Sequence, residues 1–224
     1  MEVLPEHTRR FVRAVGPSHD PVQERMAAHA AEHGFPIIGP EAGGVLRLLA
    51  RLTDAERVFE FGSGFGYSAT WFLRGMDGGR VVLTEHDPDE LALARELLAD
   101  AGLADRAAFE EGDALSTVER YDGPFDVVLV DHDKSRYAEA FERVRGKLRT
   151  GGVVVADNVL RGPADPEVLL AAAEADAVPG PEEGVDADGA TAGLARYLRR
   201  VRSDAAFETV LLPVGSGLAV SVRR

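Results

Sequence analysis

Residues 57–67 read RVFEFGSGFGY. The first five are mostly apolar, as in a short buried strand, and three glycines follow, each separated from the next by one residue. Glycines let the backbone approach a ligand closely at a tight turn between a strand and a helix. Because Tyr67 follows Gly66 directly, the spacing is GxGxG, and the GxGxxG pattern of dinucleotide-binding folds is absent. This stretch therefore predicts a strand, a ligand-binding turn and the start of a helix.

The same kind of pattern predicts strands and helices on both sides of this stretch. Strands are expected at 57–61, 80–84, 107–110, 125–130, 153–156, 207–212 and 218–222. Helices are expected at 21–33, 41–52, 67–73, 88–101, 135–148 and 194–201. Alternating strands and helices predict an α/β fold with a doubly wound, mostly parallel seven-stranded sheet. The final two strands are joined by only 213–217, which is too short for a parallel crossover, so they are expected to form a C-terminal antiparallel hairpin.

Length and composition narrow the function classes. The 224 residues are expected to form a single domain, with N-terminal helices in 1–52 as a cap and the ligand-binding sheet in 53–224. A net charge of −13 argues against a nucleic-acid partner, which would require a basic face. The chain has no cysteine, no run of 18 apolar residues and no signal-peptide pattern, so a cytoplasmic protein without disulfides or a membrane span is expected. The acidic stretch 176–189 is expected to be an exposed loop.

Acidic residues occur at or beside the end of each of the first five expected strands: Glu60, Glu85, Asp113, Asp131 and Asp157. Ligands of open α/β sheets bind at these carboxyl ends, where clustered carboxylates repel one another unless a cationic ligand is present. Glu85 follows the second strand, where an acidic residue can bind a ribose diol. Glu60 lies beside the glycines, where a carboxylate disfavours a pyrophosphate. An adenosine ligand without phosphate, carrying a zwitterionic or cationic group, fits both observations.

Four motifs carry a resemblance to a known family. Residues 60–68, EFGSGFGYS, resemble the first motif of class I methyltransferases, and the Gly-Tyr-Ser ending is similar to the catechol and caffeoyl-CoA O-methyltransferases. Residues 131–137, DHDKSRY, resemble the Asp-x-x-Lys-x-x-Tyr signature of that family. Residues 156–160, ADNVL, resemble its Asp-Asn motif, and 212–218, LPVGSGL, resemble its closing hairpin. The similarity extends from Ile37 to the C-terminus.

The resemblance implies an S-adenosylmethionine-dependent O-methyltransferase with a Rossmann-like fold, a small hydroxylated catechol-like acceptor and a homodimeric assembly. The residues implied to bind the cofactor are Ile38, Glu60, Gly62, Gly66, Ser68, Glu85, Asp113, Ala114, Asp131 and His132. The residues implied to bind a divalent metal, usually Mg²⁺, are Asp131, Asp157 and Asn158. Two carboxylates and an amide oxygen suit such a hard cation, whereas a zinc site would favour cysteine or several histidines.

Lys134 is implied as the general base. A phenol has a pKa of about 10, so its hydroxyl is mostly protonated at neutral pH, and a nearby divalent cation favours its ionisation. Lys134 lies one helical turn from Asp131 and can accept the proton. It is one of only two lysines in the chain, the other being Lys147.

Alternatives stay open at this stage. Asp133 and Arg161 depart from the family pattern near the acceptor, so a catechol-type diphenol, a flavonoid-like molecule or another hydroxylated metabolite is possible. A non-catalytic S-adenosylmethionine-binding or regulatory protein is a further alternative. A nicotinamide oxidoreductase lacks its glycine pattern here, and a nucleic-acid methyltransferase lacks a basic face.

Overall fold

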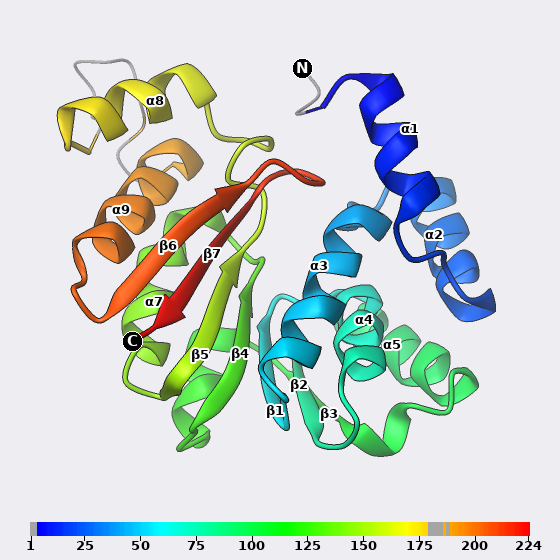
Figure 1. Cartoon of the computed structure of the whole chain (residues 1–224). Helices are drawn as coiled ribbons and strands as arrows, with labels where there is room; N and C mark the ends of the chain where they lie inside the picture. The colour runs from blue at the N-terminus through cyan, green and yellow to red at the C-terminus, as the bar shows by residue number, and fades with distance from the viewer. Residues whose placement is uncertain (1–3, 179–185, 187–188) are drawn as a thin grey trace.

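A computed structural model describes residues 4–178, 186 and 189–224 and contains one seven-stranded sheet within these residues. Its strands are β1 (Arg57–Phe61), β2 (Arg80–Glu85), β3 (Ala107–Glu111), β4 (Phe125–Val130), β5 (Leu148–Ala156), β6 (Phe207–Leu212) and β7 (Leu218–Arg223). The order across the sheet is β3-β2-β1-β4-β5-β7-β6, with the first five strands parallel and β7 antiparallel to both of its neighbours (Figure 1). The predicted fold class is confirmed.

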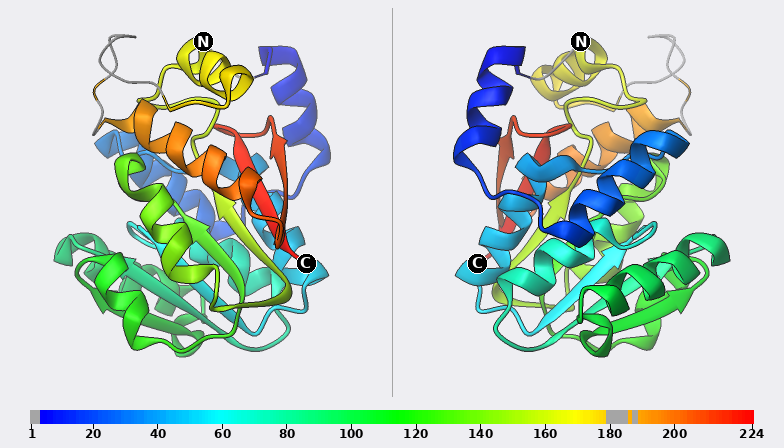
Figure 2. Two further views of the ribbon diagram at one scale, coloured as in Figure 1. Left: turned by 90° about the vertical axis from the view of Figure 1, so that its left-hand side faces the viewer. Right: turned by 90° about the vertical axis from the view of Figure 1, so that its right-hand side faces the viewer.

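Helices cover both faces of this sheet (Figure 2). In the described residues they are α1 (Glu6–Val15), α2 (Pro21–His33), α3 (Gly39–Leu52), α4 (Tyr67–Gly75), α5 (Pro88–Asp100), α6 (Ala114–Thr117), α7 (Tyr137–Val144), α8 (Pro166–Ala175) and α9 (Ala190–Ser203). Helices α2 to α5 contribute to the core on one face, and α6 to α9 contribute to the core on the other. No helix in the described ranges is long and apolar enough to cross a membrane.

Local chemistry explains where several elements begin and end. The carboxylate of Asp20 accepts hydrogen bonds from the backbone N–H groups of Val22 and Gln23, both at 2.9 Å, and Pro21 occupies the first position of α2. Gly34, with φ of 66°, ends that helix. Strand β4 is fully buried from Val127 to Val130, as its uninterrupted apolar sequence predicts for the middle of a parallel sheet.

The sequence-based boundaries were wrong in one region. The helix expected at 135–148 is a 3₁₀ turn at Lys134–Arg136 followed by α7, which already ends at Val144. The carbonyl of Lys147 accepts a hydrogen bond from the backbone N–H of Phe125 at 2.7 Å. The chain therefore pairs with β4 from this point, and β5 begins at Leu148 instead of residue 153. Sheet pairing overrides the helical preference of this segment. Helices α1, α6 and α8 were not predicted, and most of the expected acidic loop 176–189 lies outside the described residues.

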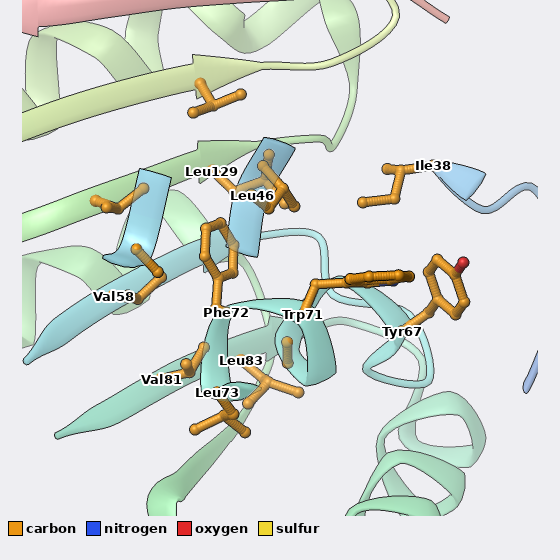
Figure 3. Close-up of a cluster of buried hydrophobic side chains, with 14 of the residues drawn as sticks. Ile38, Leu46, Val58, Tyr67, Trp71, Phe72, Leu73, Val81, Leu83 and Leu129 are labelled. Atoms are coloured by element: carbon orange, nitrogen blue, oxygen red, sulfur yellow. The ribbon is translucent and has the colours of Figure 1, made fainter. Parts of the chain in front are cut away.

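Side chains of β1 and α4 anchor the core near the site (Figure 3). Val58, Trp71 and Phe72 are fully buried, and each contributes about 1.5–3 kcal/mol of hydrophobic stabilisation by the usual area relation. A Cβ atom on Gly43 of α3 would come within 2.4 Å of the Trp71 indole. Helices α3 and α4 therefore pack closely enough to fix the ring of Trp71, which lies in the middle of α4.

Candidate functional site

The carboxyl ends of β1, β2, β4 and β5 border a cavity of about 550 Å³. The segment 35–38, between α2 and α3, lines it as well. Most of the residues that the sequence analysis selected line this one cavity: Ile38, Gly62, Ser68, Glu85, Asp113, Ala114, Asp131, His132, Lys134, Asp157 and Asn158. The motifs therefore meet in space as expected, although they are spread over more than half of the chain.

Two selected residues do not line the cavity. Glu60 is fully buried within β1. Gly66 has a φ of 82°, and a Cβ there would lie 2.9 Å from Cδ1 of Leu98 on α5, so this glycine permits close packing between helices. Gly62 differs, because it has a φ of 79° and a Cβ would lie 2.6 Å from the carbonyl oxygen of Asp131 in the cavity wall.

Glu85 is held rigidly by hydrogen bonds. Its Oε2 accepts from the backbone N–H of Gly64 at 2.9 Å, and its Oε1 accepts from those of His86 and Asp87 at 2.8 and 3.0 Å. The imidazole Nδ1 of His86 also lies 2.8 Å from Oε1. The carboxylate is thus fixed at the cavity wall by backbone donors, which is the arrangement needed to present it to a ligand hydroxyl without reorganisation.

His132 forms a flat, uncharged part of the wall. Its ring stacks on Tyr137, with centroids 5.4 Å apart and an interplanar angle of 16°. Burial lowers the pKa of His132 to about 4, and neither ring nitrogen has a hydrogen-bond partner. On the same side, the guanidinium of Arg136 donates to the Asp113 carboxylate at 2.9 Å. A neutral ring beside a paired acid suits an aromatic ligand group.

Lys134 lies beside His132 in the cavity wall. Its ammonium nitrogen donates to Oδ1 of Asp131 at 3.0 Å and to the carbonyl of His132 at 3.2 Å. It also lies 5.1 Å from the ring centroid of Tyr137. Lys134 is only 11% exposed, so its position is set by these contacts and not by solvent.

Buried carboxylates accompany this lysine. Asp157 is 2% exposed, and its Oδ1 has no hydrogen-bond partner. Burial raises the pKa of Asp157 to about 8, with a further contribution from the charge of Asp131. Burial likewise raises the pKa of Glu60 to about 8, against an opposing contribution from the Ser68 hydroxyl, and neither Glu60 oxygen is in a well-formed hydrogen bond. Such uncompensated carboxylates favour a cationic ligand close by.

The expected metal ligands fit a hard cation only in part. The described residues contain no group of three or more His, Cys, Asp or Glu side chains arranged to hold a metal ion. Asp131, Asp157 and Asn158 offer two carboxylates and one amide at the same cavity wall, and Asn158 has a φ of 58° at the turn after β5. The unpartnered Oδ1 of Asp157 is the observation in favour of a cation, since oxygen donors of this kind suit Mg²⁺.

The structure adds wall residues that the sequence analysis did not assign. Phe35, Tyr67, Arg136 and Ser216 all line the cavity. Tyr67, Arg136 and Ser216 stand inside the motifs quoted above, so their positions were available from the sequence although their roles were not. Nothing in the sequence around Phe35 indicates that it reaches the site.

Comparison with known proteins gives the class and then the family. The structure superposes on the crystal structure of an O-methyltransferase from Bacillus cereus in complex with S-adenosylhomocysteine, with a TM-score of 0.82, 26% identity and 97% coverage of both chains. Residues 21–224 match the O-methyltransferase family. The chain belongs to this family, and the enzyme class expected from the motifs is confirmed.

Two sequence relatives are similar over part of the chain. A catechol O-methyltransferase of Niastella koreensis is 38% identical over 138 residues, which is 58% of this chain and 62% of that protein. A catechol O-methyltransferase of Mycobacterium tuberculosis is 38% identical over 154 residues, covering 68% of this chain and 69% of that protein. The first match thus spans less than two thirds of the relative's length.

Proposed function

We propose that this protein transfers the methyl group of S-adenosylmethionine to one hydroxyl of a small catechol-like acceptor, with a divalent cation, Mg²⁺ by preference, bound at Asp131, Asp157 and Asn158. The observation that carries the proposal is the Lys134–Asp131 pair, 3.0 Å apart, beside the unpartnered carboxylate of Asp157 in a cavity that also presents the fixed carboxylate of Glu85. The names of the relatives, two of them catechol O-methyltransferases, support the same acceptor class.

The cofactor is assigned to the wall between Glu85 and Glu60. Glu85 accepts from the ribose hydroxyls, and the ring of His132, backed by the buried ring of Tyr137 at 5.4 Å, offers a flat surface beside Asp113 and Ala114 for the adenine. Glu60 lies fully buried beneath this wall, next to Ser68, and has no direct contact with the ligand. Gly62 and Ser68 leave room for the ligand, and Ile38 covers it.

The reaction breaks two bonds and forms two. The carbon–sulfur bond of the sulfonium breaks with its electrons left on sulfur, the acceptor oxygen forms the new carbon–oxygen bond, and the hydroxyl proton moves to Nζ of Lys134. A divalent cation bound at this wall would supply positive charge, which favours the ionised acceptor oxygen. The chain contributes orientation, because Lys134 is held by Asp131 and by the carbonyl of His132.

A direct assay tests the proposal. The purified protein is incubated with S-adenosylmethionine and a catechol, with Mg²⁺ or with EDTA, and the monomethyl ether is quantified. S-adenosylhomocysteine is expected to raise the melting temperature by mass action. Product that forms with Mg²⁺ and disappears with EDTA supports the full proposal. Full turnover in EDTA would remove the metal from it, and S-adenosylhomocysteine binding without methylation of any hydroxylated acceptor would favour a cofactor-binding or regulatory role.

The proposal includes a single domain over residues 1–224, a homodimer and a cytoplasmic location. Light scattering of the purified chain would measure the assembly, and limited proteolysis would show whether residues 1–52 separate from the sheet. A monomer at micromolar concentration would contradict the dimer without affecting the proposed reaction.

A further inference from the structure

The segment that joins α1 to α2, together with the first turn of α2, contacts one face of α4 through three polar pairs. On α4 the partners are at positions 67, 70 and 74, which lie along one side of a helix. The pairs are His19 with Tyr67 at 2.6 Å, Gln23 with Thr70 at 3.0 Å, and Asp20 with Arg74 in an ion pair. We call these contacts the α4 seam. They fix the segment 19–23 against the helix that follows the glycine-rich turn.

One pair of the α4 seam differs from the other two. Tyr67 lines the cavity, whereas Thr70 and Arg74 do not. Tyr67 is the first residue of α4, is 3% exposed and directly precedes Ser68. The hydroxyl of Tyr67, which lines the cavity, is therefore held by His19, which lies outside the sheet.

The ring of His19 packs against two aromatic rings at once. It meets Tyr67 edge-on, with centroids 5.7 Å apart and an angle of 89°, and it is tilted against Trp71 at 6.0 Å. Trp71 in turn lies edge-on to Tyr67 at 6.3 Å and has Gly43 against its indole. Figure 3 shows Tyr67, Trp71 and Ile38 at the same end of the buried cluster. The hydrogen bond to His19 thus joins a packed aromatic set and sets the direction of the Tyr67 hydroxyl.

Protonation states fix the direction of this hydrogen bond. Burial lowers the pKa of His19 below 6.5, opposed by the carboxylates of Glu24 and Asp20, so the imidazole is neutral at neutral pH. The remaining charges that face it are Arg13 on α1 and Glu41 on α3, which pair with each other at 2.5 Å. Burial raises the pKa of Tyr67 to about 12, so its hydroxyl keeps its proton. Tyr67 therefore donates to Nε2 of a neutral His19.

We propose that His19 is a positioning residue of the cofactor site, which acts by holding the Tyr67 ring in place as the cavity wall beside Ser68. The inference rests on the proposed binding of S-adenosylmethionine in this cavity. It assigns a function in ligand binding to the segment between α1 and α2, which the motifs of the sheet do not include. His19 does not touch the ligand in this proposal; Tyr67 does.

A double-mutant cycle with a matched control tests this role. The dissociation constant of S-adenosylhomocysteine and the melting temperature are measured for wild type, His19→Phe, Tyr67→Phe and the double variant. His19→Phe and Tyr67→Phe are each expected to weaken binding by about three- to tenfold, and the double variant no more than either alone, because one hydrogen bond is lost in all three. His19→Gln, whose amide oxygen can accept from Tyr67, is expected to restore most of the affinity.

Gln23→Met is the control. It removes the buried contact to Thr70, which does not line the cavity, together with the hydrogen bond from the backbone N–H of Asp20 to Oε1 of Gln23. It is expected to lower the melting temperature and leave the dissociation constant within twofold of wild type. An equal loss of affinity in Gln23→Met, or additive losses in the double variant, would overturn the positioning role. If His19→Phe does not fold, His19→Leu takes its place in the same cycle, since it also removes the hydrogen bond to Tyr67. A wild-type protein that does not bind S-adenosylhomocysteine would overturn the proposed cofactor site along with this inference.

Discussion

Glu85 and Asp157 both follow parallel strands at the same cavity, yet their surroundings are opposite. Glu85 accepts hydrogen bonds from three backbone N–H groups and is complete without a ligand. Asp157 is 2% exposed, has an unpartnered Oδ1 and a pKa raised to about 8 by burial. The comparison shows one carboxylate that backbone donors fix in advance and another that is buried with one oxygen left without a hydrogen-bond partner.

The largest effect is expected from replacing Lys134, which lies in the same part of the cavity as Asp157. Replacing Lys134 by Met removes the base, and replacing it by Arg keeps the charge but leaves a group that does not deprotonate in proteins. Both variants are expected to lose about 10²–10⁴-fold in kcat with little change in cofactor affinity. Single-turnover rates across pH would measure this. Substantial recovery in Lys134→Arg would make the residue an electrostatic anchor, and wild-type rates in Lys134→Met would exclude it from the reaction.

The second prediction concerns pH and the stability of the metal-free protein. The pKa of Asp157 is raised from 3.8 to about 8 on folding, so the folded state binds a proton that the unfolded state has released. The free energy of unfolding should therefore fall by at most about 1.4 kcal/mol per pH unit between pH 4 and 8 through this group. Asp157→Asn should flatten the fall in urea titrations with EDTA, and Mg²⁺ should reverse it in wild type only. Parallel pH profiles for the two proteins would contradict the assigned burial.

The third prediction concerns a replacement of Glu85. Glu85→Ala should weaken binding of S-adenosylhomocysteine by about 1.5–3 kcal/mol, because the ribose hydroxyls lose a charged acceptor. Stabilisation of the protein by Mg²⁺ should be unchanged, since Glu85 is not one of the proposed metal ligands. Calorimetry with each ligand separates the two results. A variant that loses binding of both S-adenosylhomocysteine and Mg²⁺ would show that the two sites are not independent.

The smallest effect is expected at His86, which contacts the same carboxylate from solvent. Its side chain is 88% exposed and its Nδ1 lies 2.8 Å from Oε1 of Glu85. An exposed contact of this kind contributes little, so His86→Asn should change cofactor affinity by less than about fivefold. A loss as large as that of Glu85→Ala would mean that the imidazole, and not the backbone, holds the carboxylate.

The positions of Glu85 and Asp157 at one cavity were both predicted from sequence, since both residues lie at or directly after the end of a strand. Parallel strands bring their carboxyl ends to one edge, so Glu85, Asp131 and Asp157 were expected to meet, and they do line one cavity. The same rule placed Glu60 in the cofactor wall, whereas the structure buries it inside β1. Position relative to a strand end therefore predicts proximity to the site, but which side chain reaches the ligand depends on the alternation of faces along the strand.

The α4 seam could not be predicted in this way. Its pairs join residues nearly fifty positions apart on segments that do not belong to the sheet, and no local pattern around His19 specifies Tyr67 as its partner. The boundary of β5 was missed for a similar reason, because Leu148 becomes a strand residue only through its pairing with Phe125. Contacts that are decided by tertiary packing leave no periodic signal in the local sequence.

The position of β7 has a consequence for how the enzyme emerges from the ribosome. Residues 218–223 pair with β5 on one side and β6 on the other, and the carbonyl oxygens of Ser216 and Gly217 accept hydrogen bonds from the backbone after Asp157 and Asn158. A nascent chain that already contains every motif of the site thus still lacks the strand that supports the Asp157 turn. The growing chain has to hold β5 with an open edge until β7 leaves the exit tunnel, and catalytic competence is expected only after that point.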